Sequence, residues 1–263
     1  MTQAYETLTL EMDPRGVATC TLNRPEKRNA MTDRMLAELI DMAGSMSADE
    51  RVRAVILTGA GDFFCAGGDL SWMKQQINAD RATRMKQARG LADALQVLNT
   101  MDKPLIGRIN GSAFGGGLGL ISVCDVAIAP MNAQFGFTET RLGLIPATIS
   151  PYVMARIGEG KARRVFMSAR LFPAQEAVAL DLLARAVPAE ELDAAVEAEV
   201  APYLSVASGA VAASKRLARR LGPRIEPDVI EATVAALADT WETEEASHGI
   251  ESFLSKTSPR WVS

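Results

Sequence analysis

The chain has 263 residues, enough to bury a sizeable core in one large domain or in one domain with an appendage. With 48% apolar, 5% aromatic and 23% charged residues, its composition is typical of a globular protein and excludes the disordered and disulfide-rich classes. The net charge of −4 gives no indication of nucleic-acid binding.

Cysteine and histidine usage restricts the chemistry further. Cys20, Cys65 and Cys124 are widely spaced and odd in number, which fits a reducing compartment better than a disulfide framework or a zinc site. The single histidine, His248, lies in a polar segment, so we expect neither an imidazole-based triad nor a His-rich metal site. No apolar run reaches membrane-spanning length and no signal peptide is recognisable, so we expect a cytoplasmic protein with no membrane partner. Acid–base chemistry would then depend on carboxylates.

The first half of the sequence alternates between predicted strands and helices. In chain order we expect a hairpin of residues 5–11 and 17–22, a helix over 32–46 with Thr32 as its N-cap, a buried strand over 52–58, a helix from about Asp69, a long helix over 82–101, a buried strand over 104–109, and short strands over 125–129 and 133–137. This order predicts an α/β layered domain.

After Pro151 the pattern is almost wholly helical. The predicted helices cover residues 160–167, 174–180, 189–204, 207–221, 227–246 and 249–254. We place the end of the α/β core near residue 195 and assign residues 196–263 to a helical appendage.

Residues 110–146 are the most unusual stretch. They begin with a dense glycine cluster and end near a carboxylate, Glu139, between two apolar runs. Glycines at this density are expected where a ligand approaches the main chain or where a helix begins abruptly. A second loop of the same form, residues 65–69, also follows a predicted strand and opens a helix. Free N–H groups at two such helix starts could hold one oxygen as an oxyanion hole.

Two nucleotide-binding alternatives fit the glycines less well. The cluster lacks the spacing of a dinucleotide fingerprint after a first strand, and no lysine of a phosphate loop follows it.

Five motifs in order and spacing resemble the enoyl-CoA hydratase/isomerase (crotonase) family. They are Asn23-Arg24-Pro25-Glu26-Lys27-Arg28-Asn29-Ala30, Phe64-Cys65-Ala66-Gly67-Gly68-Asp69-Leu70, the segment from Asn110-Gly111 to Gly117, Cys124-Asp125, and residues 135–146. The resemblance covers about residues 5–180. It implies a spiral of repeated ββα turns, a C-terminal helical region that builds a homotrimer or a dimer of trimers, and an acyl-CoA thioester as substrate. Coenzyme A is then part of the substrate, and no separate cofactor and no metal are implied.

The resemblance also implies roles for individual residues. The backbone N–H groups of Ala66 and Gly116 would bind the thioester oxygen, with a one-residue uncertainty between Gly115 and Gly116. The acyl-CoA would contact Ala66, Gly68, Asp69, Leu70, Gly115 and Gly119. By itself, Asp69 is better interpreted as a helix N-cap.

The family's hydratases use two glutamates, and only the second is present here, as Glu139. The first falls on Gly119. An apolar pocket would raise the pKa of Glu139 and suit it to proton transfer, although without the family context the residue reads equally well as a surface carboxylate paired with Arg141. Three functions stay open: a hydratase, a 3-enoyl-CoA to 2-enoyl-CoA isomerase with one base, and a non-catalytic acyl-CoA-binding scaffold.

The coenzyme and acyl ends of the substrate suggest further residues. Lys27 and Arg28 correspond to positions near the phosphates of coenzyme A, and Phe253, Lys256 and Trp261 resemble tail residues that cover the adenine of a neighbouring subunit. Residues 138–152 are similar to the methylglutaconyl-CoA or isohexenylglutaconyl-CoA hydratase branch, whose substrates carry a second carboxylate. Arg89, Arg108 and Arg141 are candidates for its partner by position alone.

Overall fold

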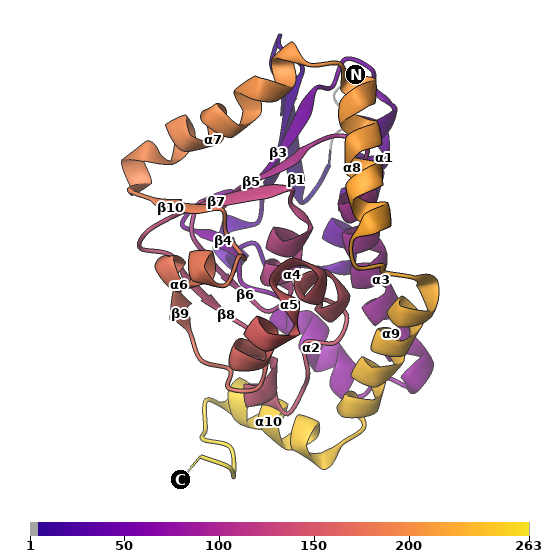
Figure 1. Ribbon diagram of the computed structural model, residues 1–263. Coiled ribbons are helices and arrows are strands. Elements are labelled where there is room, and N and C mark those ends of the chain that lie inside the picture. Colours follow the sequence, from indigo (N-terminus) through magenta and orange to yellow (C-terminus); the bar gives the residue numbers. More distant parts are fainter. Residues whose placement is uncertain (1–4, 263) are drawn as a thin grey trace.

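Two β-sheets form the centre of the computed structural model, which describes residues 5–262 (Figure 1). The six-stranded sheet has the order β1 (Leu8–Met12), β2 (Val17–Leu22), β3 (Ala54–Gly59), β5 (Leu105–Arg108), β7 (Val126–Pro130) and β10 (Arg185–Val187). The four-stranded sheet has the order β4 (Phe63–Cys65), β6 (Ser112–Phe114), β8 (Gln134–Gly136) and β9 (Phe172–Pro173).

The chain repeats one movement between the two sheets. A strand in the larger sheet is followed by a strand in the smaller sheet and then by a helix: β3, β4 and α2 (Leu70–Ile77), then β5, β6 and α4 (Gly116–Val123), then β7, β8 and α5 (Ser150–Phe166). Successive strands of these turns pair in parallel within each sheet. The predicted α/β fold and its spiral of ββα turns are therefore confirmed.

The N-terminal elements form as the sequence predicts. β1 and β2 pair as an antiparallel hairpin, in which Leu8 lies opposite Leu22. Thr32 caps α1 (Asp33–Ala48), because its hydroxyl accepts a hydrogen bond from the Met35 N–H at 3.3 Å. The apolar face of α1 packs against α3 (Arg81–Thr100), and both helices contribute to the main hydrophobic core.

Four short strands were not predicted as such. The sequence predicts loops at β4 and β6, and it predicts no strand after Pro151, where β9 and β10 form. Each of these strands has two or three residues, too few to show a period of two. β10 gains its hydrogen bonds from β7, which lies far from it in the sequence. Tertiary pairing therefore creates strands that local pattern does not encode.

The C-terminal helices surround the spiral (Figure 1). They are α6 (Ala174–Ala179), α7 (Leu192–Val200), α8 (Ser208–Leu221), α9 (Pro227–Trp241) and α10 (Glu244–Ser255), with 3-10 turns η3 (Ala189–Glu191) and η4 (Ala201–Ser205) around α7. In the view of Figure 1, α7 is at the left, α8 and α9 are at the right and α10 is at the bottom. α7 crosses residue 195 and packs on the larger sheet, where Leu192 and Val196 share a core with Ile106 and Ile128. α9 packs against α3, and α10 contacts η2 (Glu139–Leu142). The domain boundary at residue 195 stays a prediction.

No helix within residues 5–262 combines the length and the apolar character needed to cross a membrane.

Candidate active site

The two glycine-rich loops lie side by side because β4 and β6 are parallel neighbours. Cys65 at the end of β4 is in register with Ala113 of β6, so both loops leave the same end of the smaller sheet. Gly67 has a φ of +94°, and a Cβ there would lie 3.1 Å from the carbonyl oxygen of Phe114 and 3.9 Å from the nitrogen of Gly116. A side chain at residue 67 would be strained and crowded, so glycine permits this close approach.

The hydrogen bonds of these loops decide which N–H groups are available. The Ala66 N–H donates to the carbonyl oxygen of Arg28 at 3.0 Å, so the structure contradicts its predicted role as an oxyanion donor. The Gly115 N–H donates to the carbonyl oxygen of Gly136 at 3.0 Å, which removes it as the alternative to Gly116. Within residues 5–262, the N–H groups of Gly67, Gly68 and Gly116 have no hydrogen-bond acceptor. Gly68 is the bridge partner of Met31, which directs its N–H away from that segment, so Gly68 and Gly116 form the candidate oxyanion hole.

The reason for this shift lies in a segment that the sequence does not connect to the loop. Residues 28–31 pair with the loop through three hydrogen bonds, from Ala66 N–H to Arg28, from Met31 N–H to Gly67, and from Asp69 N–H to Met31. The pairing uses the N–H groups of Ala66 and Asp69. Gly68 is the parallel bridge partner of Met31, so its own N–H is directed away from this segment.

Glu139 begins η2, one residue after Thr138, and faces the second loop. Its Oε1 atom lies 3.2 Å from the point where a Cβ on Gly115 would stand. Its Oε2 atom is inaccessible to solvent and has no hydrogen-bond partner in the described chain. Arg141 does not pair with it, so the alternative of a surface ion pair is wrong. Burial raises the pKa of the Glu139 carboxyl from 4.5 to about 7, which suits it to accept and return a proton near neutral pH.

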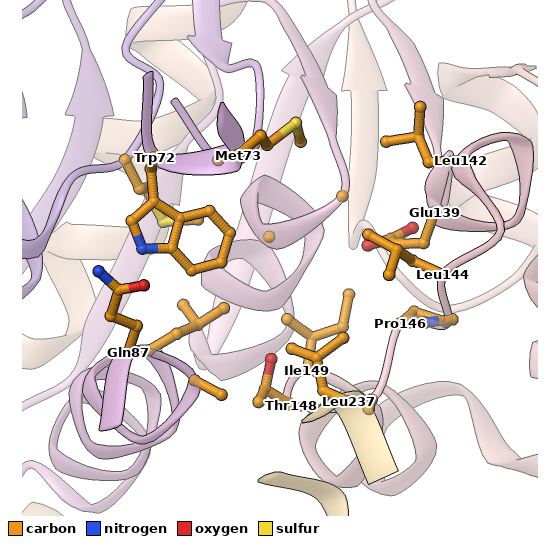
Figure 2. A pocket seen from close by; sticks show the side chains of 18 of the residues that line it. Trp72, Met73, Gln87, Glu139, Leu142, Leu144, Pro146, Thr148, Ile149 and Leu237 are labelled. Atoms are coloured by element: carbon orange, nitrogen blue, oxygen red, sulfur yellow. The ribbon is translucent and has the colours of Figure 1, made fainter. Parts of the chain in front are cut away.

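Glu139 and both candidate donors line one cavity, which Figure 2 shows from close by. Most of its wall is apolar: Met31, Leu36, Trp72, Met73, Ala88, Leu91, Leu142, Leu144, Ile145, Pro146, Ala147, Ile149, Leu237 and Trp241. Trp72 of α2 meets Trp241 of α9 edge to face, with ring centroids 6.3 Å apart. The C-terminal helix α9 therefore helps to close the site. No motif in the sequence indicates this role, because residues 72, 237 and 241 fit ordinary apolar helix faces.

Gly119 does not line this cavity. It is buried inside α4, and a Cβ there would lie 2.6 Å from Cγ2 of Ile149 and 3.2 Å from Cδ1 of Leu95. The geometry gives no support to the predicted substrate contact of Gly119, because Ile149 packs against this position and lines the cavity itself. Nor is there room at this position for the missing carboxylate.

A wider groove adjoins the cavity at the first loop. Lys27, Arg28, Asp69, Leu70 and Phe253 line it, and Ala66 and Gly68 line both hollows. η1 (Pro25–Lys27) presents Lys27, and the Arg28 guanidinium lies over the Phe63 ring at 4.8 Å from its centroid. The structure thus brings the predicted phosphate-binding pair and Phe253 to one groove that leads to Glu139.

Asp69 has a structural role at this groove. Its side chain caps α2 by accepting a hydrogen bond from the Ser71 N–H at 2.9 Å, which confirms the predicted N-cap. It also pairs with Arg24 at 3.0 Å. Although burial opposes ionisation, the hydrogen bonds from Ser71 and Arg24 hold the pKa of the Asp69 carboxyl below its usual value.

Two predicted tail residues lie outside the groove of their own chain. Lys256 ends α10 in a left-handed conformation, with φ of 56°, and lines neither hollow. Trp261 packs edge to face on His248, with centroids 5.6 Å apart. Their role over the adenine of a neighbouring subunit stays a prediction. Among the described residues, no group of three or more His, Cys, Asp or Glu side chains is placed to hold a metal ion.

Comparison with known proteins identifies the family. The family model described as enoyl-CoA hydratase/isomerase matches residues 13–263. The chain belongs to this family. Enoyl-CoA hydratase AFT3-1 of Alternaria alternata is 31% identical over 252 residues, which cover 95% of this chain and 84% of that protein. It follows that the protein is a crotonase-family enzyme, as the five motifs indicate.

Solved structures agree with this assignment. A crystal structure of an enoyl-CoA hydratase from Shewanella pealeana is 34% identical, with a TM-score of 0.81 over 99% of this chain and 97% of that chain. An enoyl-CoA hydratase/isomerase from Marinobacter aquaeolei is also 34% identical, with a TM-score of 0.78 over 97% of this chain and 99% of that chain.

Proposed function

We propose that this crotonase-family enzyme adds water across the 2,3 double bond of an enoyl-CoA thioester. One observation carries the proposal: a buried carboxylate, Glu139, lies in the same cavity as two unused N–H donors on adjacent loops. The relatives' names support hydration as the reaction class.

The two N–H groups would act on the thioester oxygen. As the double bond between C2 and C3 is attacked, negative charge moves to this oxygen and an enolate forms. Donors fixed by the backbone of Gly68 and Gly116 stabilise that charge without having to reorganise, an effect worth about 3 kcal/mol for each donor in comparable sites. Because main-chain atoms supply the donors, small side chains at both positions leave room for the oxygen.

Glu139 would carry the proton. In the ionised form it takes a proton from the attacking water, whose oxygen bonds to C3, and it then returns a proton to C2 of the enolate. Its pKa of about 7 keeps both forms accessible at neutral pH. With Gly119 in place of the other glutamate, Glu139 would perform both transfers.

A second candidate reaction is the conversion of a 3-enoyl-CoA to a 2-enoyl-CoA. The observation in its favour is the closed space at Gly119, which Ile149 fills at 2.6 Å from the Cβ position. A 1,3-proton shift removes a proton from C2 and returns it to C4, so one carboxylate and the oxyanion hole suffice. No water needs to be held.

The coenzyme would lie in the adjoining groove. Lys27 and Arg28 provide positive charge there for its phosphates, and Phe253 provides an apolar surface. The sequence similarity of residues 138–152 offers a branched glutaconyl-CoA thioester as one candidate substrate, although the cavity that contains Glu139 has no lysine or arginine among its described lining residues for the second carboxylate. We also propose a homotrimer or a dimer of trimers, since α8 leaves Leu217 and Leu221 exposed at 57% and 79%. We further propose that the protein is cytoplasmic.

Two absorbance assays and one variant test the function. The purified protein is mixed with crotonyl-, 3-methylglutaconyl- and longer 2-enoyl-CoA, and separately with 3-hexenoyl-CoA. Hydration removes the absorbance of the enoyl thioester, whereas isomerisation creates it. We expect Glu139→Gln to lose turnover by at least 10²-fold while acyl-CoA still raises the melting temperature. Binding without either absorbance change in the wild type would instead establish a non-catalytic acyl-CoA-binding scaffold.

A further inference from the structure

Hydrogen-bond acceptors line the end of the cavity opposite Glu139. Figure 2 shows the Glu139 carboxylate on one side of the cavity and the Gln87 amide on the opposite side, with Trp72, Ile149 and Leu237 between them. An acyl chain held by its thioester beside Glu139 would therefore extend along an apolar wall toward Gln87.

Gln87 is oriented by an acidic neighbour. Its Nε2 donates to Oδ2 of Asp33, the first residue of α1, at 3.4 Å. Its Oε1 is buried and has no hydrogen-bond partner in the described chain. Since Asp33 also lines the cavity, the end of the acyl chain would meet an amide oxygen and a carboxylate. The Gln87 oxygen and the Asp33 carboxylate both accept hydrogen bonds, and the charge of Asp33 repels an anion.

No positive charge offsets these acceptors. Among the described residues that line the cavity there is no lysine or arginine, and the ionisable ones are Asp33 and Glu139. The three arginines that are candidates for a second carboxylate all lie elsewhere. Arg108 pairs with Asp193 at 2.6 Å, and Arg89 pairs with Glu231. Arg141 lines the wider groove that also contains Lys27 and Arg28.

We propose that Asp33 and Gln87 make the acyl cavity selective for uncharged acyl groups and exclude acyl-CoA thioesters with a second carboxylate at the far end. A carboxylate placed there would meet the negative charge of Asp33, which is exposed at this end, and no cation of the cavity lining would offset the repulsion. The inference rests on the proposed function for its acyl-CoA ligand. It argues against a glutaconyl-type substrate and for an aliphatic one.

Saturated thioesters test this inference separately from turnover, because they bind without reacting. Dissociation constants of hexanoyl-CoA and glutaryl-CoA are measured by calorimetry at low ionic strength. Since both ligands carry the same coenzyme, their ratio reports the acyl end. We expect hexanoyl-CoA to bind at least 10-fold more tightly. Asp33→Asn should reduce this ratio several-fold, mainly by improving the binding of glutaryl-CoA.

Asp41→Asn is the matched control, because Asp41 is also on α1 and changes the net charge equally but hydrogen-bonds Tyr5 and does not line the cavity. It should leave the ratio unchanged. Equal binding of the two thioesters by the wild type would overturn the inference, and so would an equal effect of Asp33→Asn and Asp41→Asn. If the preference holds but no enoyl-CoA is turned over, the proposed hydration fails and the inference about the acyl group stands.

Discussion

Replacing Glu139 with glutamine should make the protein more stable while it abolishes turnover. Burial raises the pKa of the Glu139 carboxyl from 4.5 to about 7. A carboxyl whose pKa is raised by folding contributes its full stability below pH 4.5 and loses it as the pH rises through 7. At about 1.4 kcal/mol for each pKa unit, the wild type loses roughly 3 kcal/mol over this interval. Glutamine stays neutral and avoids the loss.

The melting temperatures of both proteins at pH 5 and pH 8 measure this effect. For a chain of this size, roughly 3 kcal/mol corresponds to an increase of about 6–12 °C for Glu139→Gln at pH 8, and the difference should shrink toward pH 5. Glu176→Gln is the control with the opposite sign, because the hydrogen bond from Arg170 holds the pKa of Glu176 below its usual value. Equal melting temperatures for wild type and Glu139→Gln at pH 8 would refute the claim that ionisation of Glu139 lowers the free energy of unfolding.

Two further variants test the backbone assignments. Gly68→Pro removes the proposed N–H donor and should lower kcat by about 10²–10³-fold. Gly68→Ala keeps the N–H and should retain activity, because its Cβ would lie at an ordinary 3.5 Å from the Trp72 ring. Equal losses of kcat in the two variants would contradict the donor role. Gly119→Ala gains about 0.5–1 kcal/mol of helix propensity but is overpacked by about 1–3 kcal/mol against Ile149, so urea unfolding should show a net destabilisation. In the double variant with Ile149→Ala the two costs should be less than additive, and strict additivity would mean that Ile149 does not fill the space.

The sequence predicts the framework of the site well because that framework depends on local chemistry. Thr32 and Asp69 are polar residues that cap helices by short-range hydrogen bonds, and both caps form as predicted. Glu139 was identified from its motif, and its apolar surroundings follow from the runs on both sides of it. Where a residue's role depends on neighbours a few positions away, pattern and structure agree.

The choice between Ala66 and Gly68 shows what the sequence leaves open. Both residues belong to one loop of small residues, and either N–H would suit an oxyanion. Only the pairing of residues 28–31 with the loop determines that the Ala66 N–H is already used. The same limit applies to Gln87 and Trp241, which reach the cavity from helices α3 and α9. Long-range packing, rather than a motif, brings them to the cavity.

The absence of a second carboxylate follows from packing as much as from the substitution itself. In a site that only lacked the glutamate, a cavity or a water would occupy the space at residue 119. Instead, the β-branched side chain of Ile149 occupies it, and Leu95 closes the other side. The space at residue 119 therefore holds no polar group, and most residues that line the cavity with Glu139 are apolar. Ile149 and Glu139 line the same cavity, so the side chain that closes the space at residue 119 belongs to the mostly apolar wall around the carboxyl whose pKa burial raises to about 7.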